Sequence, residues 1–396
     1  GSSVIPHAGE VTHSSVARMD EILKKSAAEE EARKDEKPHT LSAEEAVTKA
    51  REVYGLGNID AAAVKELDSY DDRNFVFPST TFTFDGSSAP PSTSPTIFKI
   101  HNGVESDNPA LIEAHNAVLQ HLLSGGVTVP EPLRVNSSSS PSVIGWITLP
   151  KLRTPTETRK HAVRLFGYIE GVVVGQTASE KDELWRDIGR FVGLMDQKLL
   201  MIPEVPAALR GRVHMWDLKN IPALSGFKQY IEDESRQKLQ QRVIASFLER
   251  VQPKISVLRS AVIQNDANEM NILIDETRTK VTGIIDFGDC LETCLVFEIA
   301  ICLAYMMLAK DDPLQAASHI YAGYTSELAL TEDEEDLLHL LVCSRLVQSV
   351  TMSAFSSFKD PTNEYLKLTA TSGWTLLAML EEMGQEEFMR RLKNPK

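Results

Sequence analysis

Three polar side chains, each beside an apolar run, form the part of this sequence best suited to chemistry. Asp266 precedes the run at 271–274, Asn271 begins it, and Asp286 follows a second run at 281–285. The β-branched residues and the polar turn between the runs predict a two-stranded hairpin within 263–288, which would gather the three side chains at one end. One Asp can accept the proton of a hydroxyl, and an Asn with a second Asp can hold magnesium ions. The grouping therefore predicts phosphoryl transfer, with Asp266 as catalytic base and Asn271 and Asp286 as metal ligands.

The spacing of these residues matches the protein-kinase pattern. Asp266 and Asn271 are separated by four residues, and Asp286 opens an Asp-Phe-Gly sequence. Each residue alone is a weak signal, because Asp and Asn before strands are usually turn residues. The joint order of Asp, Asn, apolar strand, turn, apolar strand and Asp-Phe-Gly is much more specific.

Lys99 supplies a second candidate group. It lies in an apolar strand, at 97–100, where a lysine is costly unless its ammonium reaches a partner. In kinases such a lysine contacts the nucleotide phosphates and pairs with a Glu on the next helix. Glu113, within a helix expected over 109–123, is the predicted partner. No Gly-rich loop precedes Lys99, but the turn within 67–75 could offer backbone N–H groups to phosphates.

The elements that must position these residues predict an α+β, two-lobed, protein-kinase-like fold. The chain has 396 residues, 42% hydrophobic, enough for two cores. Short strand-like runs fill 37–170, which predicts a small antiparallel N-lobe with a nucleotide-binding sheet. Helical patterns fill most of 171–396, which predicts a helical C-lobe carrying the catalytic hairpin. Residues 1–36 are polar and acidic, and we expect a disordered or loosely docked extension.

Composition narrows the possible partners. The formal net charge of −15 opposes nucleic-acid binding and suits a cationic small substrate. No apolar run approaches the roughly 20 residues of a membrane span, and the N-terminus lacks a secretory signal. The four cysteines fit neither a disulfide framework nor a zinc site. We therefore expect a cytoplasmic protein with free buried thiols and no membrane partner.

Two segments carry a resemblance to a known superfamily. Residues 264–273 and 283–289 resemble the aminoglycoside phosphotransferase and choline kinase superfamily. Further segments resemble the hydroxylysine kinase family within it: 67–75, 108–113, 216–220, 296–300, 341–345 and 370–374. The similarity spans about 37–384. Six segments matching in order are specific for the subfamily and less so for the substrate.

The resemblance implies a magnesium-dependent enzyme that uses GTP or ATP and phosphorylates the side-chain hydroxyl of 5-hydroxy-L-lysine. Lys99 and Glu113 would hold the α- and β-phosphates. The remaining implied positions are Ser69, Tyr70, Asp71 and Asn74 covering the phosphates, Phe166 and Tyr168 in a hinge facing the purine, and Trp216, Asp217, Asp289 and Arg345 around the acceptor. Acidic residues such as Asp217 and Asp289 would meet the amines and Arg345 the carboxylate. Asp217 as a helix cap and Arg345 as an internal ion-pair member are the alternatives.

One departure from the superfamily motif bears on activity. The usual His-Gly before the catalytic Asp is Gln264-Asn265 here. Gln supplies both a donor and an acceptor, as His does, and Asn is the residue other than Gly that best tolerates positive φ. Two alternatives stay open. The chain could be a kinase for another amino-alcohol, such as homoserine, choline or an aminoglycoside, or a pseudokinase that acts as an interaction module. The sequence does not predict an oligomeric state.

Overall fold

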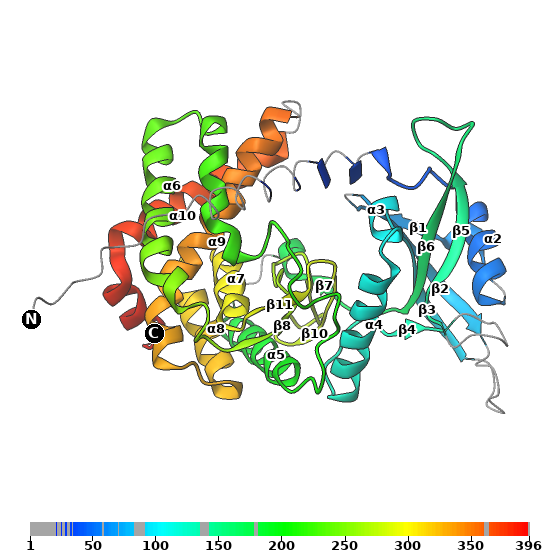
Figure 1. Ribbon diagram of the computed structural model, residues 1–396. Helices are drawn as coiled ribbons and strands as arrows, with labels where there is room; N and C mark the ends of the chain where they lie inside the picture. Colours follow the sequence, from blue (N-terminus) through cyan, green and yellow to red (C-terminus); the bar gives the residue numbers. More distant parts are fainter. Residues whose placement is uncertain are drawn as a thin grey trace, which may run out of the picture.

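The computed structural model describes residues 21–394, with gaps at 22–24, 26–27, 30–31, 34, 58, 70, 83–91, 135–141, 178–180 and 360–363. Figure 1 shows two lobes side by side, a smaller one with most of the sheet and a larger helical one. This arrangement confirms the predicted α+β, two-lobed, kinase-like architecture.

The N-lobe is built on an antiparallel sheet. Its strand order is β1-β2-β3-β6-β4, and β5 pairs with β6. The central pairs place Lys99 of β3 between Asn74 of β2 and Arg164 of β6. The strands are β1 (Lys65–Leu67), β2 (Arg73–Phe82), β3 (Ser92–Ile100), β4 (Pro132–Leu133), β5 (Gly145–Pro150) and β6 (Thr158–Gly167).

Helix α2 (Ala43–Tyr54) covers one face of this sheet (Figure 1). Ser42 and Glu45 form a capping box at its start, and Gly55 ends it with φ 62°, as the sequence predicts. Tyr54 packs edge-on against Phe98 and donates a hydrogen bond to the Val163 carbonyl. A short 3-10 turn, η1 (Ala61–Ala63), leads from the helix into the sheet.

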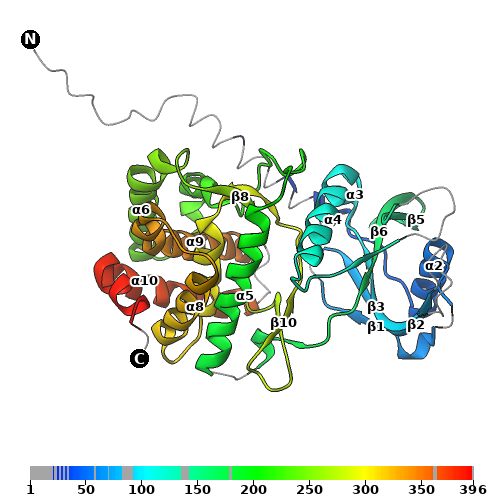
Figure 2. The ribbon, with the colours of Figure 1, turned by 90° about the horizontal axis from the view of Figure 1, so that it is seen from below.

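Two helices follow β3 and lie between the sheet and the C-lobe (Figure 2). These are α3 (Gly103–Ser106) and α4 (Pro109–Ser124). Asn102 caps α3 and Asn108 caps α4, each accepting a backbone hydrogen bond through its side chain. The buried face of α4, including Val118 and Leu122, belongs to the C-lobe core. Helix α4 therefore ties the orientation of the N-lobe to the C-lobe.

The predicted hairpin is present between the lobes. Strand β9 (Ile272–Ile274) pairs with β10 (Val281–Ile284), and β7 (Val172–Val173) adds to the other edge of β9. A second pair joins β8 (Ser260–Ile263) to β11 (Leu291–Cys294). Strand β11 is followed almost directly by helix α7 (Val296–Met306), within a region whose pattern predicts mostly helix. An apolar strand and a buried helix in sequence share one continuous apolar run, so periodicity does not separate them.

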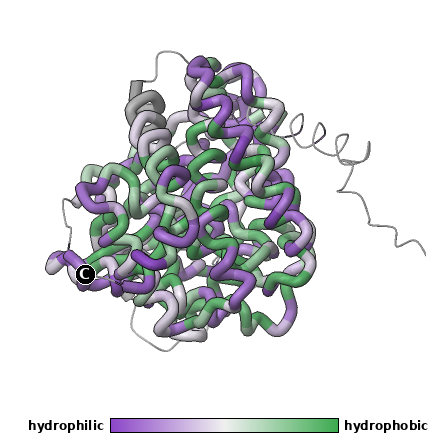
Figure 3. Tube along the Cα trace, turned by 90° about the vertical axis from the view of Figure 1, so that its left-hand side faces the viewer, coloured by the Kyte–Doolittle hydropathy of each residue, from purple (hydrophilic) through white to green (hydrophobic). Residues whose placement is uncertain are grey.

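Helices pack around these strands to form the C-lobe. Apolar and polar stretches alternate along them (Figure 3), which buries one side of each helix. They are η2 (Val174–Gln176), α5 (Asp182–Leu200), η3 (Leu218–Tyr230), α6 (Glu234–Ser246), the π-turn η4 (Phe247–Val251), η5 (Gln252–Lys254), α8 (Pro313–Glu327), α9 (Glu332–Lys359) and α10 (Glu364–Leu392, interrupted at Gly384).

Two expectations concern the C-lobe interior. By length and composition α9 could cross a membrane, but 78% of its apolar window is buried inside the protein. It is therefore the core helix of this lobe. The four cysteines, Cys290, Cys294, Cys302 and Cys343, are free and buried, as predicted.

The extension predicted over 1–36 is corrected at its C-terminal end. The described residues there bind the N-lobe instead of hanging loose. Asp35 pairs with Arg153, and Glu36 pairs with Arg159 at 2.8 Å. The polar residues of this segment show no hydrophobic periodicity from which packing could be predicted. Their ion-pair partners lie more than 100 residues away in the chain, so the sequence does not predict these contacts.

Helices α5 and α8 approach so closely that glycine is required at their crossing. A Cβ atom on Gly189 would lie 1.9 Å from the Ile320 carbonyl oxygen. We expect Gly189→Ala to lower the free energy of unfolding by about 1–3 kcal/mol, because backbone must move. Urea unfolding measures the loss. Gly167→Ala is the control, since its Cβ would meet nothing closer than 3.7 Å. Equal losses in both variants would contradict this account of the crossing.

Candidate active site

Asp266 lies in the loop between β8 and β9, held by hydrogen bonds from three directions. Its Oδ2 accepts from Asn268 Nδ2 at 2.9 Å and from Asn271 Nδ2 at 2.8 Å. Its Oδ1 lies 3.3 Å from Arg345 Nη2. Its carbonyl accepts from Asn271 Nδ2 at 2.9 Å. The side chain is 25% exposed, so it is fixed in place yet accessible to a small molecule.

Gln264 links this loop to the Asp-Phe-Gly segment. Its Oε1 accepts from the Asp266 N–H at 2.7 Å, and its Nε2 donates to the Asp286 carbonyl at 2.5 Å. The amide uses its acceptor on one predicted catalytic residue and its donor on the other. This is the dual role predicted for Gln in place of His.

Asn265 adopts φ 70°, so the backbone here does need the left-handed region. Its N–H and that of Gln264 both donate to Glu298 Oε2 of α7, at 3.0 and 2.5 Å. Glu298 is fully buried. Glu298 stands out in the sequence because it is the one acid within an apolar helix. Its contact with the catalytic loop depends on how α7 packs, so the sequence does not predict it.

The positive φ gives a direct prediction for Asn265. We expect Asn265→Gly to keep the loop geometry with little change in stability, and Asn265→Ala to cost about 1–2 kcal/mol. Thermal unfolding of both variants, with kcat/KM alongside, measures the difference. An Ala variant as stable and active as the Gly variant would show that the left-handed conformation is not required.

Arg345 is a positioning residue, and its predicted role as a carboxylate ligand is wrong. It is 1% exposed, and its guanidinium lies between the rings of Trp216 and Tyr305, 4.9 and 5.2 Å from their centroids. It donates to the Trp216 carbonyl at 3.0 Å and to Gln348 Oε1 at 2.9 Å, in addition to its contact with Asp266. The alternative of an internal ion pair is therefore correct. Trp216 supports this arginine, next to the site.

The metal-ligand candidates fit a hard cation. Asn271 donates both of its hydrogen bonds through Nδ2, so Oδ1 is the atom with which it could bind a metal ion. Asp286 follows β10 with φ 58° and adds a carboxylate. Oxygen donors of this kind suit Mg²⁺.

Burial and the nearby Asp289 raise the pKa of Asp266 to about 8, while Arg345 opposes the rise.

Lys99 faces this group from the N-lobe, but with a different partner from the one predicted. Its Nζ lies 2.6 Å from Asp72 Oδ2. Glu113 is exposed on α4 and accepts from Asn116 instead, so the expected pair with Lys99 is wrong. Burial works against the ammonium of Lys99, yet Asp72, Asp286 and Glu105 together raise its pKa. Lys99 therefore keeps its charge in a buried position.

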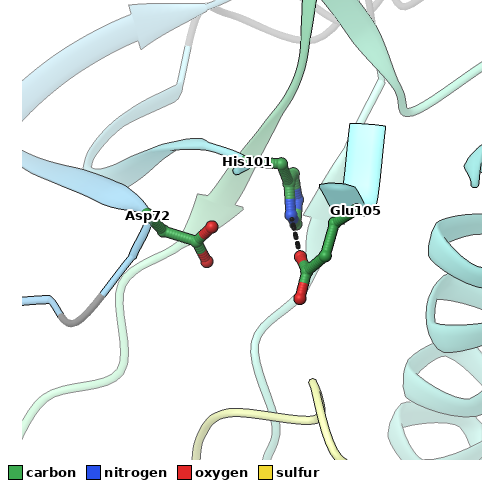
Figure 4. A group of neighbouring side chains, drawn as sticks. All are labelled: Asp72, His101 and Glu105. Carbon is green, nitrogen blue, oxygen red and sulfur yellow. Dashed lines mark hydrogen bonds and ion pairs between the residues drawn. The ribbon is translucent and has the colours of Figure 1, made fainter. Parts of the chain in front are cut away.

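Asp72, the partner of Lys99, lies close to His101 and Glu105 (Figure 4), and the ligand atoms of the three are close enough to hold a metal ion. His101 argues against that use, because both of its nitrogens are engaged. Nδ1 lies 2.8 Å from Glu105 Oε2, and Nε2 accepts from Arg164 Nε at 2.9 Å. Burial lowers the pKa of His101, so it is neutral. The three side chains form an acidic group beside Lys99, in which Asp72 pairs with the lysine and His101 is hydrogen-bonded to Glu105.

The turn before β2 lies next to this acidic group. Asp71 pairs with Arg33, and the Ser69 carbonyl accepts from Lys37 Nζ at 3.0 Å. Asn74 is the cross-strand neighbour of Lys99. Tyr70 lies outside the described residues. The turn is thus beside Lys99, as predicted, but its Asp71 is already ion-paired.

The predicted hinge connects β6 to β7. Phe166 is buried, with the Arg164 guanidinium 4.7 Å from its ring centroid. The Tyr168 N–H donates to the Pro95 carbonyl at 3.2 Å, and the Gly167 N–H donates to Glu131. These two N–H groups are therefore already bonded within the protein, and the predicted backbone contact with a purine would need other hinge groups, such as the Tyr168 carbonyl.

The predicted acceptor residues divide into two groups. Asp217 is wrong as a substrate ligand, because it is buried, accepts from Thr293 Oγ1 at 2.8 Å and caps η3. Asp289 does lie beside Asp266, and its side chain is 31% exposed. Its Oδ1 is 3.3 Å from His214 Nε2. Burial lowers the pKa of His214 to about 4, so this histidine is neutral and does not offset the charge of Asp289.

The fold and this geometry define a class of protein. A small antiparallel lobe carries a charged lysine, and a helical lobe presents an Asp held by a fixed loop, with Asn and Asp oxygen ligands beside it. This is the arrangement of a two-lobed, kinase-like phosphotransferase that acts on an alcohol.

Comparison with known proteins agrees. The phosphotransferase enzyme family (APH) matches residues 88–331. A hydroxylysine kinase of Mus musculus is 31% identical over 343 residues, covering 84% of this chain and 88% of its own. One of Xenopus laevis is 31% identical over 87% of this chain and 91% of its own. The chain belongs to the phosphotransferase enzyme family, as its sequence indicates.

Solved structures share the fold at lower identity. An aminopropanol kinase associated with a microcompartment has a TM-score of 0.63 at 18% identity, covering 87% of this chain and 98% of its own. Amicoumacin kinase, in complex with AMP-PNP and Ca²⁺, has a TM-score of 0.59 at 13% identity, covering 86% and 93%.

Proposed function

We propose that this enzyme transfers the γ-phosphate of GTP or ATP, with Mg²⁺, to the side-chain hydroxyl of 5-hydroxy-L-lysine. The observation that carries the proposal is the held geometry of Asp266, bonded to Asn268, Asn271 and Arg345 on a loop fixed by Gln264. The hydroxylysine kinases that match most of the chain support the acceptor. With Gln264 and Asn265 in place of His-Gly, the backbone N–H groups of residues 264–266 still find acceptors in Glu298 Oε2 and Gln264 Oε1, which disfavours a pseudokinase.

Some residues would act on the nucleotide that donates the phosphoryl group, and Asp266 would act on the hydroxyl that accepts it. Asn271 Oδ1 and the Asp286 carboxylate would hold Mg²⁺, which neutralises phosphate charge when bound. Lys99 adds a fixed positive charge from the N-lobe. Asp266 orients the acceptor hydroxyl and takes its proton as the oxygen attacks the γ-phosphorus and the bond to the β-phosphate oxygen breaks.

Asp289 supports a cationic acceptor. It is half-buried, close to Asp266, and the histidine that it contacts is neutral. A protonated amine of the substrate would pair with its carboxylate. Asp289 is therefore the proposed amine ligand, and the acceptor is an amino-alcohol.

Radiolabelled phosphoryl transfer tests the proposal. Purified protein is incubated with γ-labelled GTP or ATP, Mg²⁺ and each of hydroxylysine, homoserine, choline and an aminoglycoside. We expect the highest kcat/KM with hydroxylysine. Folded protein that labels none of these acceptors with either donor would overturn the proposal, and preference for another acceptor would replace hydroxylysine.

A further inference from the structure

The described residues of the N-terminal segment, Arg33 and 35–37, contact the part of the N-lobe that surrounds Lys99. The Arg33 carbonyl accepts from Asn102 Nδ2 at 2.8 Å, and the Glu36 carbonyl accepts from the Gly103 N–H at 2.9 Å. Lys37 reaches the Ser69 carbonyl. The segment therefore binds both the turn before β2 and the start of α3, which are the two elements that supply Asp72 and Glu105.

The Glu36–Arg159 ion pair packs against the start of α3. The Glu36 carboxylate lies 2.8 Å from Arg159 Nε. Arg159 Nη2 donates to the Gly103 carbonyl at 2.8 Å. The segment is therefore held to α3 by side-chain as well as backbone contacts.

Arg33 is the charged residue of this segment that contacts the acidic group beside Lys99. Its Nη1 pairs with Asp71 and lies 3.5 Å from Glu105 Oε1, and its side chain is only 23% exposed. Around it, the carboxylates of Asp71, Asp72 and Glu105 face the cations of Lys99 and Arg164. Arg33 is the third cation, and without it the cluster has an excess negative charge.

That excess would matter at a phosphate site. Lys99 would then be shared among three carboxylates instead of facing the nucleotide. Burial, with a further contribution from Asp72, raises the pKa of Asp71 to about 6 even with Arg33 beside it. A nucleoside triphosphate brings further negative charge to the same place.

Arg33 also stands where the two lobes meet. Its charge contributes to lowering the pKa of His214, which lies on the C-lobe and contacts Asp289. Figures 1 and 2 agree that the described residues of this segment lie beside α3 on the side toward the helical lobe.

We infer that Arg33 is a positioning residue of the donor site, which neutralises Asp71 and Glu105 so that Lys99 and the turn before β2 can receive the nucleotide phosphates. The inference rests on the proposed function for the nucleotide only, and not on the identity of the acceptor. Arg33 acts through these carboxylates.

The test is nucleotide affinity in full-length variants, measured by titration calorimetry with Mg-GTP and Mg-ATP. We expect Arg33→Gln to weaken nucleotide binding about tenfold, as for one uncompensated partly buried charge, and Arg33→Lys to lose much less. Arg153→Gln is the matched control. It removes the contact of Asp35 with the β5–β6 hairpin, on the same segment but away from the donor turn, and should leave affinity unchanged.

A double variant separates the charge effect from a general loss of structure. Asp71→Asn in the Arg33→Gln background removes the uncompensated acid and should restore most of the affinity. Thermal unfolding identifies a variant that is not folded, and Arg33→Lys then replaces it in the comparison. Equal binding by wild type and Arg33→Gln, or a loss that Asp71→Asn does not relieve, overturns the inference alone. Wild-type protein that binds neither nucleotide overturns the proposed function and the inference with it.

Discussion

Replacing Asp266 with Asn is expected to lower kcat by about 10²–10⁴-fold while nucleotide binding persists. The amide can still accept a hydrogen bond from Asn268 or Asn271, so the loop keeps most of its shape. It cannot take the proton of the acceptor hydroxyl. Steady-state kinetics, with calorimetry for the nucleotide, measure the two effects separately.

Asp217→Asn is the contrasting variant. Asp217 is also an aspartate and is more buried, but its contacts are with Thr293 and the start of η3. We expect a loss of stability with kcat unchanged. A large kcat loss in Asp217→Asn, or a small one in Asp266→Asn, would contradict the assignment of the catalytic base.

Replacing Glu298 with Ala is expected to have the second largest effect. Two buried N–H groups, of Gln264 and Asn265, would lose their acceptor. Each unsatisfied buried donor costs about 1–3 kcal/mol, so we expect a loss of about 2–4 kcal/mol in the free energy of unfolding. The loosened loop should also lower kcat. Urea unfolding and kinetics on the same preparation measure both.

Glu298→Gln separates hydrogen bonding from charge, because its amide oxygen can still accept. Burial raises the pKa of Glu298 to about 7. An acid with a raised folded pKa binds more protons folded than unfolded, so wild-type stability falls as pH rises from its ordinary pKa toward 7. The Gln variant has no such loss. Its stability relative to wild type should therefore increase over that range, and an opposite trend would contradict the raised pKa of buried Glu298.

Much of the catalytic hairpin could be predicted from the sequence, because its signals are local. Asn271 and Asp286 stand at the ends of apolar β runs, and β9 and β10 pair as expected. Asn265 adopts positive φ, and Gln264 uses both its donor and its acceptor. These features follow from residue types within about 25 positions of one another.

The interactions between distant segments could not be predicted in this way. Lys99 pairs with Asp72 and not Glu113, because α3 intervenes and α4 turns Glu113 outward. Arg345 on α9 contacts Asp266, which lies 79 residues earlier in the chain. Because this contact cannot be read from the sequence, the arginine was predicted to be a substrate ligand. Side-chain geometry across the fold decides such pairs, and no spacing rule encodes it.

The most direct test of the central claim is the identity of the product. Wild-type protein, Mg²⁺, GTP and 5-hydroxy-L-lysine are incubated together, and the product is analysed by ³¹P–¹H correlation NMR, with lysine and Asp266→Asn as controls. We predict a phosphorus signal coupled to the proton on the hydroxyl-bearing side-chain carbon, and none with lysine or the variant. Phosphate on an amine or carboxylate, or transfer that persists in Asp266→Asn, would contradict the account.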